Sequence, residues 1–219
     1  MQTSDHLRIA FTNLITTTLT AAVTIALFGT AQAATYTYSA LIKSFDTPPE
    51  LGGLEYRSTS GAPSINNRLE AAGTVHLVPD APSGVGFRLL RFDRTRFSTL
   101  VSSGTDVPGA PGATIDLLRT NPIVSQNGDI LFSSTLSRAG ATFPADDGLF
   151  RLSGSTLETL VWAGDIVDGV EIGPFSIGGN SGAISPSGQV AFQATFDDGT
   201  SDKFGLFREE AGGFSLAVQ

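Results

Sequence analysis

The chain has 219 residues, no cysteine, and 21 acidic against 13 basic side chains, which gives a net charge of −8. The lack of cysteine excludes disulfides, thiolate nucleophiles and cysteine-ligated metal sites. The acidic balance disfavours nucleic acid and anionic membrane surfaces as partners, because both are polyanions. With 25 glycines and 11 prolines, the composition favours short strands and turns.

Residues 1–33 have the features of a secretory signal peptide. Arg8 precedes a run without charge from Leu14 to Phe28, and an Ala-x-Ala pattern ends at Ala33. We predict cleavage after Ala33, a secreted or cell-surface location, and no stable membrane span once the protein is processed. A retained anchor is the alternative, although the apolar run is shorter than the ~20 residues that a spanning helix needs.

Residues 34–60 form an N-terminal segment between the signal peptide and a series of repeats. Thr35–Ile42 alternates apolar and polar side chains, which predicts a strand. Phe45–Pro49 is loosely similar to a loop that returns later in the chain. One interpretation is a strand left from an earlier unit, which covers a sheet edge as N-terminal strands do in ring propellers.

Residues 61–219 contain a repeat with a period of 55 to 60 residues. Two pairs of segments carry it: Ser125–Phe132 matches Ser185–Phe192, and Asp147–Arg151 matches Phe204–Arg208. A period of this size indicates one supersecondary unit that was copied, whose copies bury apolar faces against one another. We therefore divide the domain into units of roughly 61–121, 122–181 and 182–219.

The first unit matches the second less closely. Its matches are Gly73 with Gly128, Leu90-Arg91 with Phe150-Arg151, and Leu100–Gly104 with Leu160–Gly164. The glycine that opens each strand suits a turn with positive φ, so we expect this conformation at Gly128 and Gly188.

Alternation within a unit predicts three or four strands. Ile130, Phe132 and Leu136 share one parity and therefore one face of a strand. Strands at 148–152 and 156–162 follow, joined by a hairpin turn at 153–155, and a weaker strand is expected at 115–117 and at 175–177. This make-up predicts an all-β domain of about three propeller-like blades of antiparallel strands.

Three blades are too few for a closed ring, because closed propellers use ~4–8 blades. The expected form is therefore an open arc or a fragment of a β-propeller, and a compact sandwich or barrel is the alternative. Exposed strand edges recruit partners, so we expect a homo-oligomer.

A known signature matches these repeats in part. Gly188, Phe192 and Gly199 have the spacing of Asn-x-x-Gly-x-x-x-Phe followed by a glycine, and Gly128 and Phe132 match its middle. At the asparagine position the copies have Glu70, Ser125 and Ser185. The pattern resembles the bacterial choice-of-anchor tandem repeats over residues 60–219. This resemblance implies a propeller-like secreted protein without an established activity.

The residue types for catalysis are scarce. His76 is the only histidine after the signal peptide, and its parity opposite Val75 and Leu77 predicts a solvated strand residue. One histidine without cysteine leaves no histidine cluster for zinc and no Ser-His-Asp triad. Trp162 breaks the repeat, because the first unit has Ser102 there. It either stacks on a sugar, or fills a gap in the core or packs under a loop, and we favour a packing role.

Carboxylates and arginines are the remaining candidates. The acidic residues expected in loops are Asp146, Asp147, Asp165, Asp168, Asp197 and Asp198. Paired carboxylates serve glycoside hydrolysis or calcium binding, but Asp-Gly pairs also favour tight turns, which we consider the better interpretation. A basic stretch comprises Arg88, Arg91, Arg94 and Arg96, and we interpret it as a solvated strand face with its turn.

The sequence thus predicts no catalytic, cofactor-binding or metal-binding residue. We expect a secreted or cell-surface β-repeat protein with a binding or structural role, whose ligand is a protein or a glycan. A carbohydrate-active enzyme that uses loop carboxylates such as Asp147 and Asp165 is the alternative.

Overall fold

The computed structural model divides the chain into two compact parts, Met1–Ser44 and Phe45–Gln219. The described residues are 22–23, 34–35, 46–59, 61–78, 86–93, 96–118, 121–138, 147–173, 182–197 and 201–218. Within Met1–Ser44, β1 (Ala22–Val23) pairs antiparallel with β2 (Ala34–Thr35). The signal peptide predicted at 1–33 and most of the strand predicted at 35–42 lie outside the described residues.

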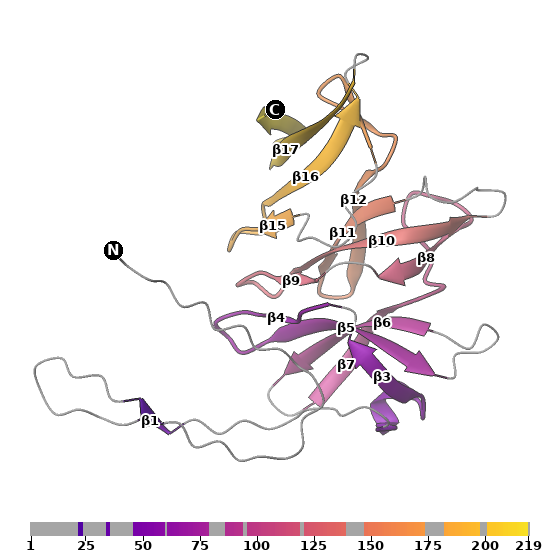
Figure 1. The fold of residues 1–219 in the computed structure, drawn as a ribbon, viewed down its shortest axis with the longest axis vertical. Coiled ribbons are helices and arrows are strands. Elements are labelled where there is room, and N and C mark those ends of the chain that lie inside the picture. Colours follow the sequence, from indigo (N-terminus) through magenta and orange to yellow (C-terminus); the bar gives the residue numbers. More distant parts are fainter. Residues whose placement is uncertain are drawn as a thin grey trace, which may run out of the picture. The chain divides into compact units, whose positions relative to one another are not determined.

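Strands within Phe45–Gln219 form three antiparallel sheets, which we call the first, second and third sheets in chain order (Figure 1). The first contains β3 (Glu55–Thr59), β4 (Ser64–Ile65), β5 (Ala71–Val78), β6 (Gly86–Asp93) and β7 (Arg96–Ser102). The second contains β8 (Ala113–Leu118), β9 (Ile123–Val124), β10 (Ile130–Arg138), β11 (Asp147–Ser153) and β12 (Thr156–Trp162). The third contains β13 (Ile166–Val167), β14 (Val170–Ile172), β15 (Gly182–Ile184), β16 (Val190–Asp197), β17 (Asp202–Glu210) and β18 (Gly213–Val218).

The three sheets share one layout. The long strands β5, β10 and β16 each pair with the strand that follows them, and that strand pairs with the next one, so three strands form a meander. On its other side, each long strand pairs with a strand that comes earlier in the chain: β3, β8 or β14. The predicted hairpin turn at 153–155 is present, with φ of 62° at Gly154. The all-β architecture of about three propeller-like blades is therefore confirmed.

Each sheet begins before its repeat unit does, by one strand in the first and second sheets and by two in the third. The strand β8 comes from the unit predicted at 61–121 but belongs to the second sheet. The fourth strand predicted at 175–177 lies outside the described residues, and β14 takes the place in the third sheet that β8 has in the second. The N-terminal segment supplies β3 to the first sheet, where Tyr56 donates to the carbonyl of Asp46. This bond repeats at Ile115 with Thr105 and at Ile172 with Asp165.

Two apolar clusters hold the sheets together. One contains side chains of the first and second sheets, such as Leu89 and Phe132. The other contains side chains of the second and third sheets, such as Leu131 and Phe192. Alternate residues of β10 enter different clusters, because the second sheet is covered on both faces.

Stacked phenylalanines occupy matching positions in the second and third sheets. The rings of Phe132 and Phe150 lie 5.4 Å apart, and those of Phe192 and Phe207 lie 5.0 Å apart. All four side chains are buried, as the repeat predicted. Each pair faces the preceding sheet, so aromatic burial of this kind fixes the spacing between sheets.

The described residues contain one helical element, the 3-10 turn η1 (Pro49–Leu51). Among them no helix has the length and apolar character needed to cross a membrane.

Candidate functional site

Turns at the start of the long strands carry the signature residues of the repeat. Gly128 and Gly188 have φ of 90° and 89°, a conformation that glycine adopts without a Cβ penalty, as predicted. In each turn a serine hydroxyl accepts a hydrogen bond from the backbone N–H four residues later, at 3.0 Å. The serines are Ser125 and Ser185.

The first unit has the same turn in a different register from the one predicted. Leu69 has φ of 62° and donates its N–H to the carbonyl of Asn66, as Gly128 does to Ser125. Leu69 and not Gly73 is therefore the counterpart of Gly128, and Asn66 and not Glu70 stands at the asparagine position of the signature. The prediction was wrong because the first unit has lost the glycine that marks this turn.

Asn66 links the first turn to the second. Its amide Nδ2 donates to the carbonyl of Ser125 at 2.9 Å and to Glu70 at 2.8 Å, while its Oδ1 accepts from the N–H groups of Arg68 and Glu70. The side chain is buried, so these bonds form out of reach of bulk water. The hydrogen bond from Asn66, with the charge of Arg91, holds the pKa of Glu70 below its ordinary value.

An arginine of each of the first two sheets lies against the turn of the next sheet. Arg91 forms an ion pair with Glu70 at 2.6 Å, and its Nη2 lies so close to Gly128 that an added Cβ would be 2.9 Å away. Arg151 donates to the carbonyl of Gly188 at 2.9 Å. Arg151 therefore bonds to the turn of the third sheet, and Arg91 lies in contact with the turn of the second.

Arg151 is the more heavily engaged of the two. It also pairs with Glu158 on its own sheet and with Glu209 on the third sheet, whose Oε2 accepts the N–H of Val190. Burial by itself lowers the pKa of Arg151, but the hydrogen bonds and charges of Glu158 and Glu209 outweigh burial and hold it above its ordinary value.

The third sheet repeats this arrangement on a face that is open. Register pairs Arg208 with Ala191, as it pairs Arg151 with Leu131. Arg208 forms an ion pair with Glu210, next to it on the same face, and its side chain is 65% exposed. Register likewise matches Leu206 to Leu149. We call the side of the third sheet that carries Phe204, Leu206 and Arg208 the outer face.

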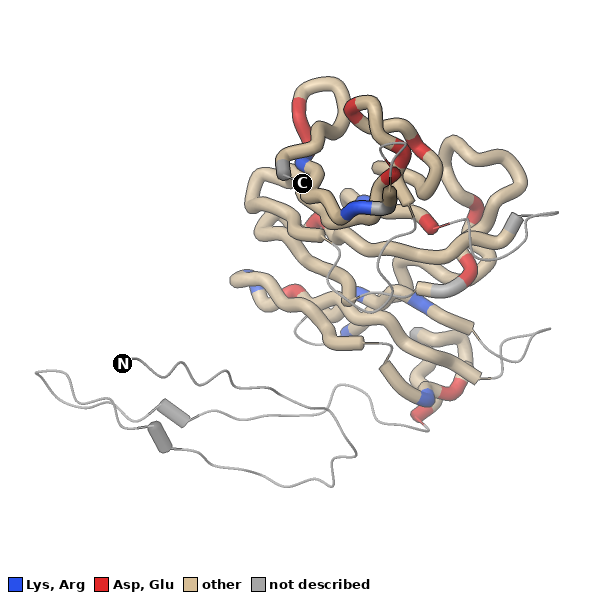
Figure 2. Tube along the Cα trace, turned by 45° about the horizontal axis from the view of Figure 1, so that its top comes forward, with Lys and Arg blue, Asp and Glu red and all other residues tan. Residues whose placement is uncertain are grey.

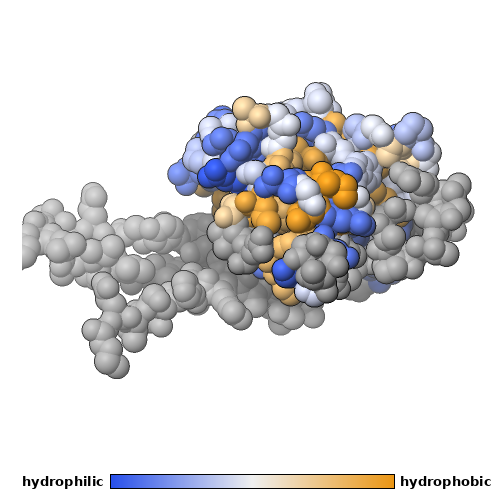
Figure 3. All heavy atoms as spheres, turned by 90° about the horizontal axis from the view of Figure 1, so that it is seen from above, coloured by the Kyte–Doolittle hydropathy of each residue, from blue (hydrophilic) through white to orange (hydrophobic). Residues whose placement is uncertain are grey.

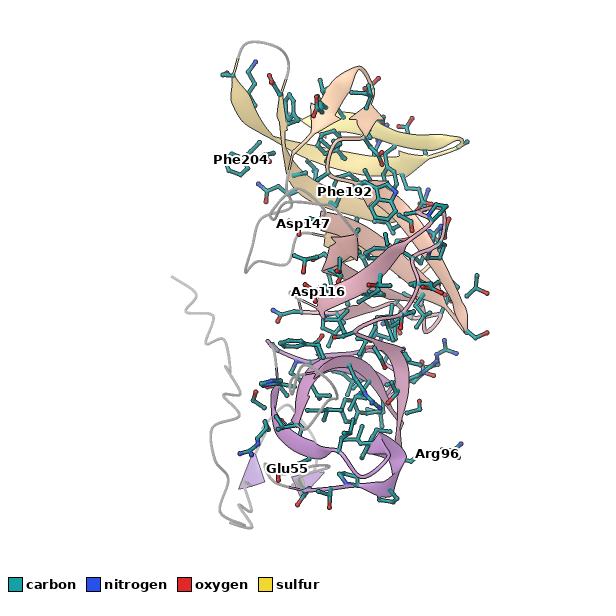
Figure 4. The ribbon with its side chains drawn as sticks, turned by 90° about the vertical axis from the view of Figure 1, so that its right-hand side faces the viewer. Glu55, Arg96, Asp116, Asp147, Phe192 and Phe204 are labelled. Atoms are coloured by element: carbon teal, nitrogen blue, oxygen red, sulfur yellow. The ribbon has the colours of Figure 1, made fainter. Side chains whose placement is uncertain are left out.

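The outer face exposes large apolar side chains. Phe204 is 60% exposed and Leu206 44%, whereas Leu149 is 2% exposed in the same position of the second sheet. Figure 4 shows Phe204 projecting away from the ribbon, while Phe192 lies among the packed strands. Seen from the end of the molecule where the third sheet lies, apolar surface gathers in the middle of a hydrophilic surround (Figure 3). This face is the candidate binding surface.

Two of the candidate carboxylates, Asp165 and Asp168, accept backbone N–H groups. Asp147 begins β11 and is buried, and Asp197 ends β16. The prediction that these two residues lie in loops was therefore wrong. Asp165 accepts the N–H of Trp162 at 2.8 Å, and Asp168 accepts that of Leu216 at 3.3 Å. The turn interpretation therefore describes Asp165 and also Asp168, which forms with Gly169 the two-residue turn between β13 and β14, at φ of 52° and 82°. Asp146 and Asp198 lie outside the described residues.

Two further candidates have packing roles. His76 is half-buried, with its ring stacked on Phe87 at 5.1 Å, so the prediction of a solvated side chain was wrong. The reason is that this face of β5 is turned toward the second sheet. Trp162 packs edge-to-face on Phe150 at 6.0 Å, which confirms its place in the core.

The arginines of the basic stretch differ in how far they are exposed to solvent. Arg88 and Arg91 lie on opposite faces of β6 and are half-buried, whereas Arg96 is exposed. The prediction of a solvated face is thus correct for Arg96 and wrong for Arg91, which is paired to Glu70. Arg94 lies outside the described residues.

A small pocket lies between the second and third sheets, with a volume of about 10 Å³, which is room for about one water molecule. Its lining comprises Asn121, Ile123, Leu131, Phe132, Ser133, Leu149 and Gly182.

Across the described residues, no three acidic or histidine side chains are grouped as metal ligands would be. Acidic residues are spread over the molecule rather than gathered at one place (Figure 2).

Sequence reasoning missed the outer face, although a signal for it exists. Leu89 and Arg91, Leu149 and Arg151, and Leu206 and Arg208 repeat a Leu-x-Arg pattern.

No curated protein and no solved structure matches the chain. Residues 17–219 match a family of unknown function, DUF7453. Because this match spans nearly the whole chain, the protein belongs to that family.

Proposed function

We propose that this is a secreted or cell-surface β-repeat protein whose role is to bind or to scaffold. The observation that carries the proposal is the exposed apolar outer face, with Phe204 60% and Leu206 44% exposed. A contiguous exposed apolar surface on a folded protein often marks an interaction site.

The polar residues that the repeat keeps support the same role. Asn66, Ser125 and Ser185 close turns, Arg91 pairs with Glu70, and Arg151 donates to the turn of the third sheet. These side chains therefore have partners within the fold. The charge-free N-terminal run and the resemblance to the choice-of-anchor repeats support export. Asn66 adds to this resemblance, since it restores the asparagine of the signature.

The test of export is fractionation of cells that express the full chain with a C-terminal tag, followed by mass spectrometry of the exported protein. We expect the protein outside the cytoplasm, with its first residue after Ala33. Intact chain in the cytoplasm would contradict the proposal.

The test of the non-catalytic role is turnover on a broad glycoside panel, with Asp147→Asn and Asp165→Asn as variants. We expect no sugar release above that of a heat-denatured sample. Turnover that the wild type shows and the folded Asp165→Asn variant loses would favour a carbohydrate-active enzyme.

A further inference from the structure

The outer face of the third sheet matches faces that are already interfaces. In the first sheet Leu89 is buried against the second sheet, and in the second sheet Leu149 is buried against the third. Leu206 is matched to both by strand register. The outer face is therefore built like two surfaces that each pack against another β-sheet.

Building on the proposed binding role, we propose that this outer face binds the outer face of a second copy of the chain, forming a two-fold dimer. Two of the three equivalent faces are covered by the next sheet of the same chain. A β-sheet of this kind is therefore the partner that fits the outer face of the third sheet. Closed two-fold dimers are also the commonest protein oligomers.

Head-to-tail stacking needs a second open face, and the first sheet does not offer one. On the side of that sheet turned away from the second, Val75, Leu77 and Leu90 are buried. Leu51 of η1, which contacts β7, is buried too, as is Tyr56, which pairs with Leu77. The outer face of the third sheet is left to pair with its own counterpart.

The chemistry of the outer face is self-complementary. Phe204 and Arg208 flank Leu206 along β17, all on one side of the strand. A two-fold axis that lies in the interface near Leu206, perpendicular to β17, places Phe204 of one copy opposite Arg208 of the other. An arginine over an aromatic ring is attractive, and more so when both are withdrawn from water. The same axis brings the two Leu206 side chains together at the centre.

Light scattering on the exported protein, measured over a range of concentrations, tests this pairing. We expect a dimer, and we expect Leu206→Lys to raise its dissociation constant by at least ~10-fold, because it places two charges at the centre of the interface. Ile65→Lys is the matched control, since Ile65 is also a large exposed aliphatic side chain but lies on the first sheet. It should leave the dimer unchanged. Circular dichroism checks that both variants are folded.

Cross-linking locates the interface independently of affinity. The chain has no cysteine, so Leu206→Cys introduces a single thiol, and Ile65→Cys does the same for the control. Packed sheets lie ~10 Å apart, which is too far for a disulfide, so a short bismaleimide is the probe. We expect Leu206→Cys and not Ile65→Cys to yield covalent dimers.

Three outcomes would overturn the two-fold pairing: a monomer at all concentrations, a dimer that Leu206→Lys leaves intact, or open-ended species that cross-link through Ile65→Cys. None of these results touches export or glycoside turnover, so the pairing can fail while the proposed function stands.

Discussion

The second and third sheets present nearly the same face to very different surroundings. Leu149 and Arg151 of the second sheet are covered by the third, whereas Leu206 and Arg208, at the matching positions, face outward. The repeat therefore copies a surface together with its strands, whether or not a neighbouring sheet covers it. Variants at matching positions measure how much each part of that surface gains from being covered.

The largest contrast is between two phenylalanines of the third sheet. Phe192→Ala removes a fully buried ring from the stack with Phe207, and we expect it to lower the free energy of unfolding by about 3–5 kcal/mol. Phe204→Ala, on the outer face, should cost below about 1 kcal/mol in the monomer. Urea denaturation at a concentration where the protein is monomeric compares them. Equal losses would mean that the outer face is covered in solution.

The leucines at matching positions of two sheets give the next contrast. Leu149→Ala empties space in the cluster between the second and third sheets, and should cost about 2–5 kcal/mol. Leu206→Ala should change the stability of the monomer by less than about 1 kcal/mol. The same denaturation measurement applies. A loss at Leu206 as large as that at Leu149 would break the comparison between covered and open faces.

The arginines separate covered from open charges. Arg151→Ala removes the ion-pair partner of Glu209 and the side-chain donor to the carbonyl of Gly188, and we expect a loss of about 1–3 kcal/mol. Arg208→Ala removes an exposed ion pair and should have little effect on stability. Thermal and urea denaturation provide the measurement. If both variants were neutral, Arg151 would not connect the sheets energetically.

The turns test the register found in the first unit. Gly128→Val forces a branched side chain into positive φ beside Arg91 and should cost at least about 1–2 kcal/mol, whereas Asn127→Asp, at an exposed neighbour, should be nearly neutral. At the matching position, Leu69→Gly should stabilise the protein by up to about 1 kcal/mol, because it relieves the same strain. Leu69→Ala keeps the Cβ and should bring no gain. Destabilisation by Leu69→Gly would contradict the match with Gly128.

The smallest expected effect is a dependence on pH at Glu70. Its pKa is held below the ordinary value by Asn66 and Arg91, so the ionised form stabilises the fold. This contribution is complete above the ordinary pKa of about 4.3 and is lost as pH falls through the lowered value. We therefore expect the advantage of wild type over Glu70→Gln to be largest near neutral pH and to vanish in acid. Parallel stability curves for the two proteins would show that Glu70 contributes no such pH-dependent term.

Much of the fold was predictable because the repeat is local in sequence. Alternation placed Phe132, Phe150, Phe192 and Phe207 in the core, and the glycine pattern placed positive φ at Gly128 and Gly188. The first unit was misaligned because Leu69 takes a backbone conformation that its residue type disfavours. The hydrogen bonds of neighbours then hold that conformation, and they are invisible in a residue pattern.

The residue pattern was enough to predict the main strands, their two-residue period and the turns at Gly128 and Gly188, because each depends on residues close together in the chain. Which strands share a sheet, and which faces are covered, depended on packing in three dimensions. Register brought Asn66 to Ser125 and Arg151 to Gly188 across 59 and 37 residues, and such pairs depend on how sheets pack. The same packing buries Leu149 and leaves Leu206 exposed, because a side chain's burial is a property of its neighbouring sheet and not of its own strand.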